Sequence, residues 1–180
     1  KIDALKSEAD NLLNIFTALL RITNIESGKR YSELNQIDIH LLLIDLVEMY
    51  EPLSSDKKQI LSLSSYSFPI KADADLLFQA LVNILDNAIK YTPDGGEINI
   101  DLSSTKNRLS IKVSDNGVGV TEELLPKLSQ RFYRVESSRS EPGNGLGLSM
   151  VEAVVNFHNG NIKMSNNHPG LVVELSLPTN

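Results

Sequence analysis

The chain has 180 residues, of which 41% are hydrophobic and 22% charged, and its formal net charge is −6. These values are ordinary for a globular domain, and the acidic balance gives no reason to expect bulk attraction to nucleic acid or to anionic lipid. The absence of cysteine excludes disulfides, zinc–thiolate sites and a cysteine nucleophile, and no apolar run approaches the roughly 20 residues that a membrane helix needs.

Residues 1 to about 27 carry an apolar seam that is typical of a helix in a bundle or a coiled coil. Apolar or small side chains recur there at alternating spacings of three and four, at Ile2, Leu5, Ala9, Leu12, Phe16 and Leu19. Ser27 and Gly28 then end the helix, because glycine commonly follows the last helical residue. A single helix cannot bury such a seam. We therefore predict that it either folds back onto the domain or pairs with helices from upstream sequence or from a second chain.

From residue 33 onward, short strands are mixed with helices. In chain order the pattern predicts a strand over 36–39, a helix over 40–54, strands over 59–64 and 70–72, a helix over 74–91, strands over 97–102 and 109–113, a short helix over 121–128, a helix over 148–157, and strands over 162–164 and 172–177. Several of these strands are adjacent in sequence. We therefore predict an α+β fold, a two-layer sandwich in which a mixed sheet is covered by helices on one face.

The predicted helix over 74–91 has a polar wedge on an otherwise apolar surface. The wedge comprises Gln79, Asn83, Asp86, Asn87 and Lys90, which line up at spacings of three, four and seven. A solvent-facing stripe is one interpretation, but asparagine is a poor helix former and is unusual on an exposed face. Amide oxygens suit Mg²⁺ that also binds phosphate, and Lys90 suits a phosphate. Asp86 is a candidate acid or base, or an acceptor that supports a ligand.

Two glycine-rich motifs follow that helix. In DNGVGV, residues 115–120, the glycines allow close approach to a ligand, and Asp115 can accept a hydrogen bond from an exocyclic amine such as that of adenine. In GNGLGL, residues 143–148, backbone N–H groups at the start of a helix can bind phosphate. Its spacing fits neither a Rossmann fingerprint nor a P-loop. Each motif alone is weak, and DNGVGV also reads as a simple turn.

The irregular segment between the two motifs predicts a lid over about residues 126–146. Loops of this length in compact domains tend to be functional lids or disordered. We expect Phe132 and Tyr133 to anchor it against the core. A solvated basic loop is the alternative interpretation. The basic residues that a lid would bring to a triphosphate are Lys127, Arg131, Arg134 and Arg139.

These motifs, in this order, resemble the ATP-binding domain of sensor histidine kinases. The matching stretches are NILDNAIKYTP, DNGVGV, QRFYRVESSRS and GNGLGLSMV. The superfamily also includes gyrase, the Hsp90 chaperones and MutL, but the FYR element and the KYTP ending favour the kinase branch. Residues 1–28 resemble the second helix of the kinase dimerisation and phosphoacceptor hairpin. The resemblance implies a Bergerat-type ATP-binding fold over residues 29–180, preceded by one long coiled-coil-like helix.

The resemblance also implies roles for individual residues. The residues implied to bind phosphates and Mg²⁺ are Asn83, Asn87, Lys90 and Tyr91, with Asn87 as the metal ligand, and the implied catalytic set is Asn87, Lys90 and Asp86. Those implied at the adenine are Asp115, Gly117 and Gly119. Those implied in the lid and beside the phosphates are Phe132, Tyr133, Arg134, Gly143, Gly145, Leu146, Gly147 and Leu148. Two departures stand out: Ser129 replaces an apolar or aromatic residue, and Val172 and Val173 replace Thr and Phe.

The implied function is transfer of the γ-phosphate of Mg·ATP to a histidine upstream of residue 1, for relay to a response-regulator aspartate. His40, His158 and His168 lack a phosphoacceptor motif, and we interpret each as structural or solvated. The chain begins without Met. We expect a cytoplasmic fragment of a homodimer anchored in the bacterial inner membrane, with no nucleic-acid partner. The alternatives are an ATPase that drives a conformational cycle and a non-catalytic nucleotide-binding dimerisation module.

Overall fold

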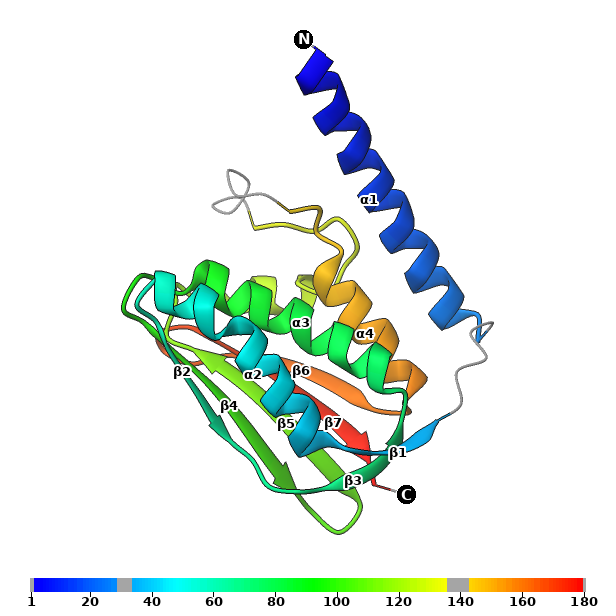
Figure 1. The fold of residues 1–180 in the computed structure, drawn as a ribbon, viewed down its shortest axis with the longest axis vertical. Helices are drawn as coiled ribbons and strands as arrows, with labels where there is room; N and C mark the ends of the chain where they lie inside the picture. Colours follow the sequence, from blue (N-terminus) through cyan, green and yellow to red (C-terminus); the bar gives the residue numbers. More distant parts are fainter. Residues whose placement is uncertain (1, 29–33, 136–142, 180) are drawn as a thin grey trace.

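The computed structural model describes residues 2–28, 34–135 and 143–179, and Figure 1 shows their arrangement. In chain order the elements are α1 (Ile2–Glu26), β1 (Asn35–Asp38), α2 (Ile39–Asp56), β2 (Ile60–Ser64), β3 (Pro69–Ala72), α3 (Ala74–Tyr91), β4 (Glu97–Ser104), β5 (Arg108–Asp115), the 3₁₀-helix η1 (Glu122–Lys127), α4 (Gly147–Phe157), β6 (Asn161–Asn166) and β7 (Leu171–Pro178). Among the described residues, no helix combines the length and the apolar character needed to cross a bilayer.

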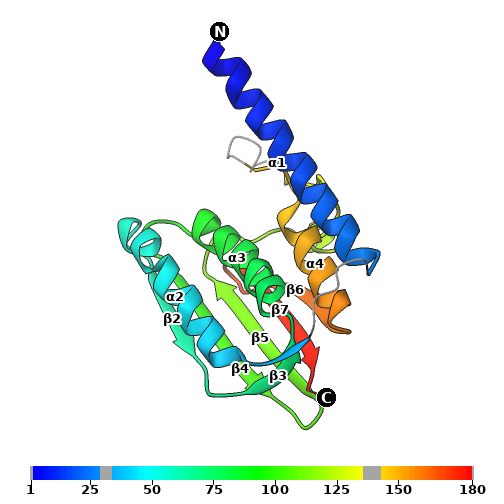
Figure 2. The same ribbon diagram turned by 45° about the vertical axis from the view of Figure 1, so that its right-hand side comes forward.

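Five strands form a mixed sheet in the order β2-β4-β5-β7-β6. The β2–β4 pair is parallel, and the remaining pairs are antiparallel, including the β4–β5 hairpin. β1 and β3 make a separate antiparallel pair. Figures 1 and 2 show α2, α3 and α4 together on one face of the large sheet. The predicted two-layer α+β sandwich is therefore confirmed.

α3 lies at the centre of the helical layer, and its bounds match the predicted helix at both ends. The carboxylate of Asp73 accepts the backbone N–H of Leu76 at 3.0 Å and caps its first turn. The apolar face of the helix is buried in the core that it shares with the inward-facing residues of the sheet. Leu77 and Leu81 are fully buried there, and burial of each contributes roughly 1.5–3 kcal/mol. This packing leaves the polar wedge of α3 turned away from the sheet.

α1 divides into two parts with different surroundings. Near its C-terminal end, Ile22 and Ile25 are 0% and 3% exposed, and the helix packs against α4. The rest of the helix projects beyond the domain (Figure 1), and its apolar side chains Leu12, Leu13, Phe16 and Leu20 are 48–63% exposed. The helix ends as predicted, with Gly28 at φ +63°. One end of α1 thus folds back onto the domain, while the other presents an apolar stripe to solvent.

Candidate functional site

A cleft of about 520 Å³ lies between α3, the end of β5, the segment after η1 and the start of α4. This volume is within the range of small-molecule sites. Most of the residues that the sequence nominated line it: Asn83, Asp86, Asn87, Lys90, Tyr91, Asp115, Gly119, Tyr133, Arg134, Gly143, Gly145, Gly147 and Leu148. Gly117, Phe132 and Leu146 lie outside the lining, as do Lys127 and Arg131, two of the basic residues expected to reach a triphosphate. The three motifs, far apart in sequence, therefore converge on one cavity.

The polar wedge of α3 forms one wall of the cleft. Asn83 donates its side-chain N–H to the carbonyl of Gln79 at 2.9 Å. Its Oδ1 then faces the start of α4, where a Cβ added at Gly147 would lie 3.2 Å away. The side chain of Lys90 extends toward the glycine loop, residues 143–148. Its Nζ lies 3.6 Å from the position that a Cβ would take at Gly143. The wedge is thus a cavity wall, which explains asparagines in mid-helix better than a solvent stripe does.

Asp86 is held from outside the cleft by a residue that the sequence did not nominate. The hydroxyl of Tyr50, on α2, donates to Asp86 Oδ1 at 2.5 Å. Burial of Tyr50, together with the carboxylate of Asp86, raises the pKa of the tyrosine, so this hydroxyl stays a donor. The hydroxyl of a buried tyrosine needs a polar partner, and this requirement is the sequence signal by which Tyr50 could have been identified.

Asp115 ends β5 at the opposite wall, and only 7% of it is exposed. Burial raises the pKa of its carboxyl group, against the opposing effect of backbone N–H groups that donate to it. Its Oδ1 accepts from Gly117 at 2.8 Å and Leu171 at 3.3 Å. The surrounding lining is apolar: Ile84, Val113, Val118, Val120, Leu171 and Val173. This region, hereafter the Asp115 end, suits a flat apolar ring that carries a donor at one edge.

The glycines of DNGVGV permit contacts between backbones. A Cβ at Gly117 would lie 2.4 Å from the carbonyl oxygen of Tyr91, so Gly117 packs against the end of α3 and does not line the cleft. Gly119 has φ +62°, and a Cβ there would lie 2.9 Å from the carbonyl oxygen of Gly170. The close approach that these two glycines make in the structure is to the protein's own backbone, and the predicted approach to a ligand stays a prediction.

The glycine loop forms the other extremity of the cleft, hereafter the glycine-loop end. Gly145 has φ +70°, and its carbonyl accepts the backbone N–H of Phe132 at 2.9 Å. Arg134 donates from Nη1 to the carbonyl of Gly143 at 2.7 Å. These two bonds hold the segment after η1 against the glycine loop. They leave the start of α4 facing the cleft, where its N-terminal N–H groups favour anions.

The aromatic pair in the expected lid is not arranged as predicted. Phe132 has φ +64° and its side chain is 54% exposed, so it does not anchor the segment in the core. Its left-handed backbone serves the hydrogen bond to Gly145 and turns the ring outward. Tyr133 instead lines the cleft, and Leu146 is buried, with its carbonyl accepting from the hydroxyl of Ser149 at 2.9 Å. Arg139 lies outside the described residues.

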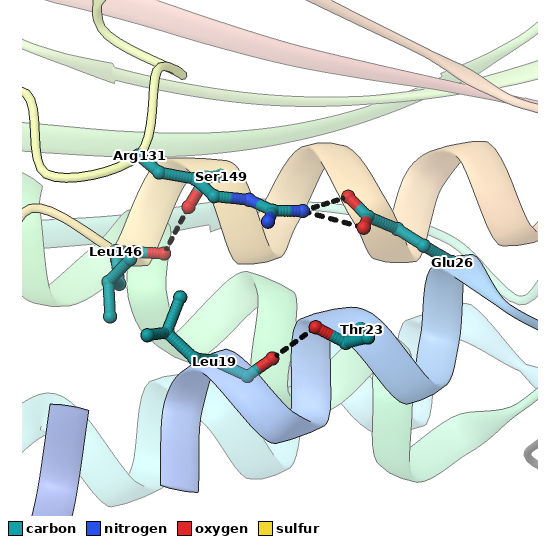
Figure 3. Close-up of polar contacts among 6 residues, drawn as sticks. All are labelled: Leu19, Thr23, Glu26, Arg131, Leu146 and Ser149. Carbon is teal, nitrogen blue, oxygen red and sulfur yellow. Dashed lines mark hydrogen bonds and ion pairs between the residues drawn. The ribbon is translucent and has the colours of Figure 1, made fainter. Parts of the chain in front are cut away.

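One ion pair connects the segment after η1 to α1, as Figure 3 shows. Arg131 Nη2 donates to both carboxylate oxygens of Glu26, at 2.5 and 2.6 Å. Their side chains are 40% and 49% exposed. Glu26 is the last residue of α1, and Ile22 and Ile25 are buried beside it against the domain. A buried apolar contact therefore joins α1 to α4, and an exposed ion pair joins it to the segment after η1, two elements that border the cleft.

The described histidines lie away from the cleft. His158 accepts the backbone N–H of Asp73 at Nε2, 3.0 Å away, and its Nδ1 lies 2.8 Å from the carbonyl of Val154. Burial lowers its pKa, which keeps it neutral. His40 Nδ1 lies 2.7 Å from the hydroxyl of Ser65, and His168 has φ +49° in the turn before β7. Their surroundings agree with structural roles for His40 and His158.

Known proteins similar to this chain include ATPases and sensor kinases, in agreement with the geometry of the cleft. A family model described as histidine kinase-, DNA gyrase B-, and HSP90-like ATPase matches residues 72–180. The sensor-like histidine kinase SenX3 of Mycolicibacterium smegmatis is 28% identical over 96% of this chain and 46% of its own length. The phosphate regulon sensor protein PhoR of Pseudomonas aeruginosa is 30% identical over 91% of this chain and 38% of its own length.

The structure of the mycobacterial sensor histidine kinase MprB matches with a TM-score of 0.74 at 27% identity, covering 80% of this chain and 97% of that one. The present chain spans less than half the length of the two curated relatives. The family model covers the elements that build the cleft, from α3 to the end of β7. The chain belongs to the histidine kinase-, DNA gyrase B- and HSP90-like ATPase family, as the ATP-binding catalytic domain of a sensor histidine kinase.

Proposed function

We propose that this domain holds Mg·ATP in the cleft and presents the γ-phosphate to a histidine on the helical hairpin to which α1 belongs. The phosphoryl group then passes to an aspartate of a response regulator. The observation that carries this proposal is the pairing of two unlike ends in one cavity. A buried carboxylate among apolar side chains suits a base, and a glycine loop with an amide and lysine wall suits phosphates.

At the Asp115 end, the carboxylate accepts a hydrogen bond from the exocyclic amine of adenine, while the apolar side chains enclose the ring. Gly119 holds the DNGVGV loop against the backbone of Gly170, which leaves room in the cleft for the base. At the glycine-loop end, the N–H groups at the start of α4 and the ammonium of Lys90 face the phosphates. Transfer then depends on positioning and charge neutralisation, as expected for phosphoryl transfer.

The polar wedge of α3 fits Mg²⁺. Asn87 lines the cleft and offers a neutral amide oxygen. Asn83 lies one helical turn before it, and Asp86 precedes it directly in the sequence. Hard oxygen donors of this kind suit an ion that takes its remaining ligands from water and phosphates. Asn87 would hold the ion, which supplies charge neutralisation at the phosphates. Tyr50 would orient Asp86 through its hydrogen bond.

We assign residues 1–28 to the second helix of the phosphoacceptor hairpin, residues 29–180 to the catalytic domain and about 126–146 to its lid. The exposed apolar stripe of α1 supports this division. Leu12, Leu13, Phe16 and Leu20 occupy a face adjacent to the one that packs on α4. The first hairpin helix and a second chain would cover that stripe. We further propose that the complete protein is a homodimer whose catalytic domain is cytoplasmic and tethered to the bacterial inner membrane.

Phosphotransfer tests this function directly. The full-length protein incubated with γ-labelled ATP and Mg²⁺ is expected to acquire an acid-labile, base-stable label on a histidine that precedes α1. Adding the cognate response regulator should move the label to an aspartate. Steady release of inorganic phosphate without a labelled histidine would contradict the proposal and favour an ATPase. Failure to bind ATP at millimolar concentration would contradict both.

A further inference from the structure

The turn between β6 and β7, residues 166–171 (hereafter the β6–β7 turn), lies against the DNGVGV loop. Asn167 donates from Nδ2 to the carbonyl oxygen of Asp115 at 2.9 Å. Asn166 Oδ1 accepts the backbone N–H of Val120 at 3.2 Å. The backbone N–H of Leu171 donates to Asp115 Oδ1 at 3.3 Å. The turn therefore contacts the loop at its first residue, at its last residue and at the carboxylate itself.

Gly170 makes the closest approach in this contact. Its φ is +103°, and a Cβ added there would lie 1.8 Å from the carbonyl oxygen of Asp115 and 2.9 Å from the Cα of Asn116. Backbone therefore packs directly on backbone, with no flexible side chain between them to absorb a change. The turn is also closed on itself, because the N–H of Asn167 donates to the carbonyl of Gly170 at 2.9 Å. It forms a preformed support behind the carboxylate.

The chemistry of the Asp115 end makes the position of this support important. Apart from Asp115, the lining side chains there are apolar, so the carboxylate carries base recognition. A hydrogen bond weakens steeply when its distance or angle departs from the optimum, and small misplacements at binding sites have large effects. A shift of the Asp115 backbone would therefore reduce discrimination between bases before it reduced apolar or phosphate contacts.

We infer that the β6–β7 turn is a positioning element for base recognition, in which Asn167 fixes the backbone of Asp115 and Gly170 sets its depth in the cleft. This inference rests on the proposed role of Asp115 as the acceptor of the adenine amine. The positioning residues act through Asp115 and do not line the cleft themselves. Leu171, which does line it, adds a direct bond to the carboxylate.

The test compares dissociation constants of ATP and of purine riboside triphosphate, which lacks the 6-amino group, for this chain by titration calorimetry with Mg²⁺ present. The wild type is expected to prefer ATP by at least about tenfold, the value of one charge-assisted hydrogen bond. Asn167→Ala should reduce that preference to about threefold or less, while its affinity for the deaminated nucleotide stays within about twofold of wild type. Asn167→Gln, which keeps an amide donor, should retain part of the preference.

Asn161→Ala is the matched control, because Asn161 is an exposed asparagine on the same hairpin, at the start of β6. It should leave the preference unchanged. If Asn167→Ala lowers both affinities equally, or leaves the ratio at its wild-type value, the turn is only structural and the inference is wrong. A wild type that does not discriminate would instead contradict the proposed role of Asp115, and the positioning role with it.

Discussion

The two ends of the cleft are built by different means. At the Asp115 end, the carboxylate is buried at the terminus of a sheet strand, and backbone packs on backbone at Gly117, Gly119 and Gly170. At the glycine-loop end, Gly145 makes one such backbone approach, to Phe132 and Tyr133, and hydrogen bonds from Phe132 and Arg134 hold the facing segments together. The first end is fixed mainly by backbone packing at three glycines, whereas the second combines one close backbone contact with partly exposed polar contacts.

This difference has a thermodynamic meaning. Regions with few buried contacts and exposed hydrogen bonds open at low free energy, whereas packed sheet termini open only with the whole domain. The end proposed to recognise the base is therefore preorganised. The end proposed to admit and release the phosphates is held in part by contacts that cost little to break. Five experiments test this contrast, beginning with the largest expected effect.

Alanine substitution of glycines that share a positive φ measures the packing at each end. Gly170→Ala should lower the free energy of unfolding by about 3 kcal/mol or more, because its Cβ would overlap the backbone of Asp115. Gly145→Ala should cost about 2 kcal/mol, since its Cβ would lie 2.8 Å from the backbone of Phe132. Gly95→Ala supplies the control at about 1 kcal/mol, because its φ is +77° but its surroundings are open. Urea unfolding gives the three values, and equal losses would remove the contrast.

Asp115→Asn separates binding from stability at the Asp115 end. The amide oxygen can still accept from Gly117 and Leu171, but the proposed acceptor for the adenine amine is lost. ATP affinity should therefore fall about 10- to 100-fold, the effect of a charge-assisted hydrogen bond. The free energy of unfolding should stay level or rise, because the variant no longer buries a charge. A loss of stability that matches the loss of affinity would mean that Asp115 is structural.

The same variant should change the pH dependence of stability. Folding raises the pKa of Asp115 because the carboxyl group is buried, so the native state holds this proton more tightly than the unfolded state does. Its contribution to stability is full below the unfolded pKa and is lost as the pH rises through the folded pKa. In Asp115→Asn this decline with rising pH should disappear from the melting temperature. An unchanged profile would contradict burial as the cause.

Asn87→Ala tests the proposed metal contact toward the glycine-loop end. Removing the amide oxygen should weaken ATP binding about tenfold when Mg²⁺ is present and hardly at all when it is chelated, because the lost contact is to the ion. Gln79→Ala is the matched control, since Gln79 belongs to the same polar wedge but does not line the cleft. A loss of the same size with and without Mg²⁺ would remove Asn87 as the ligand.

The elements that sequence predicted best are those in which local signals agree. For α3, the apolar face and the polar wedge both indicated the same helix, and its wedge became a wall of the cleft. Cleft residues with reactive or charged side chains, such as Asp115 and Lys90, could also be predicted from the sequence, because the signals around them are local. Their types and order already restricted what they could bind.

The contacts that sequence missed depend on distant packing. Tyr50 and Asp86 are 36 positions apart and meet because α2 and α3 pack side by side. Asn167 reads as an ordinary turn residue, and its bond to Asp115 spans 52 positions. Phe132 was expected in the core because it is aromatic, but a left-handed backbone turned it outward. Local propensity carries no information on such pairings.

The smallest expected effect concerns the ion pair between Arg131 and Glu26, which joins the glycine-loop end to α1 (Figure 3). Both side chains are partly exposed, so a double-mutant cycle with Glu26→Gln and Arg131→Gln should give a coupling energy of at most about 1 kcal/mol. The coupling should fall in high salt, because exposed charges are screened.

The informative readout is the affinity for ATP. If α1 and the segment after η1 are linked only at this surface, each single variant should shift that affinity by less than about threefold, and the two shifts should not add. Shifts as large as that of Asp115→Asn would show that the glycine-loop end is as firmly organised as the Asp115 end, and that the position of α1 controls it.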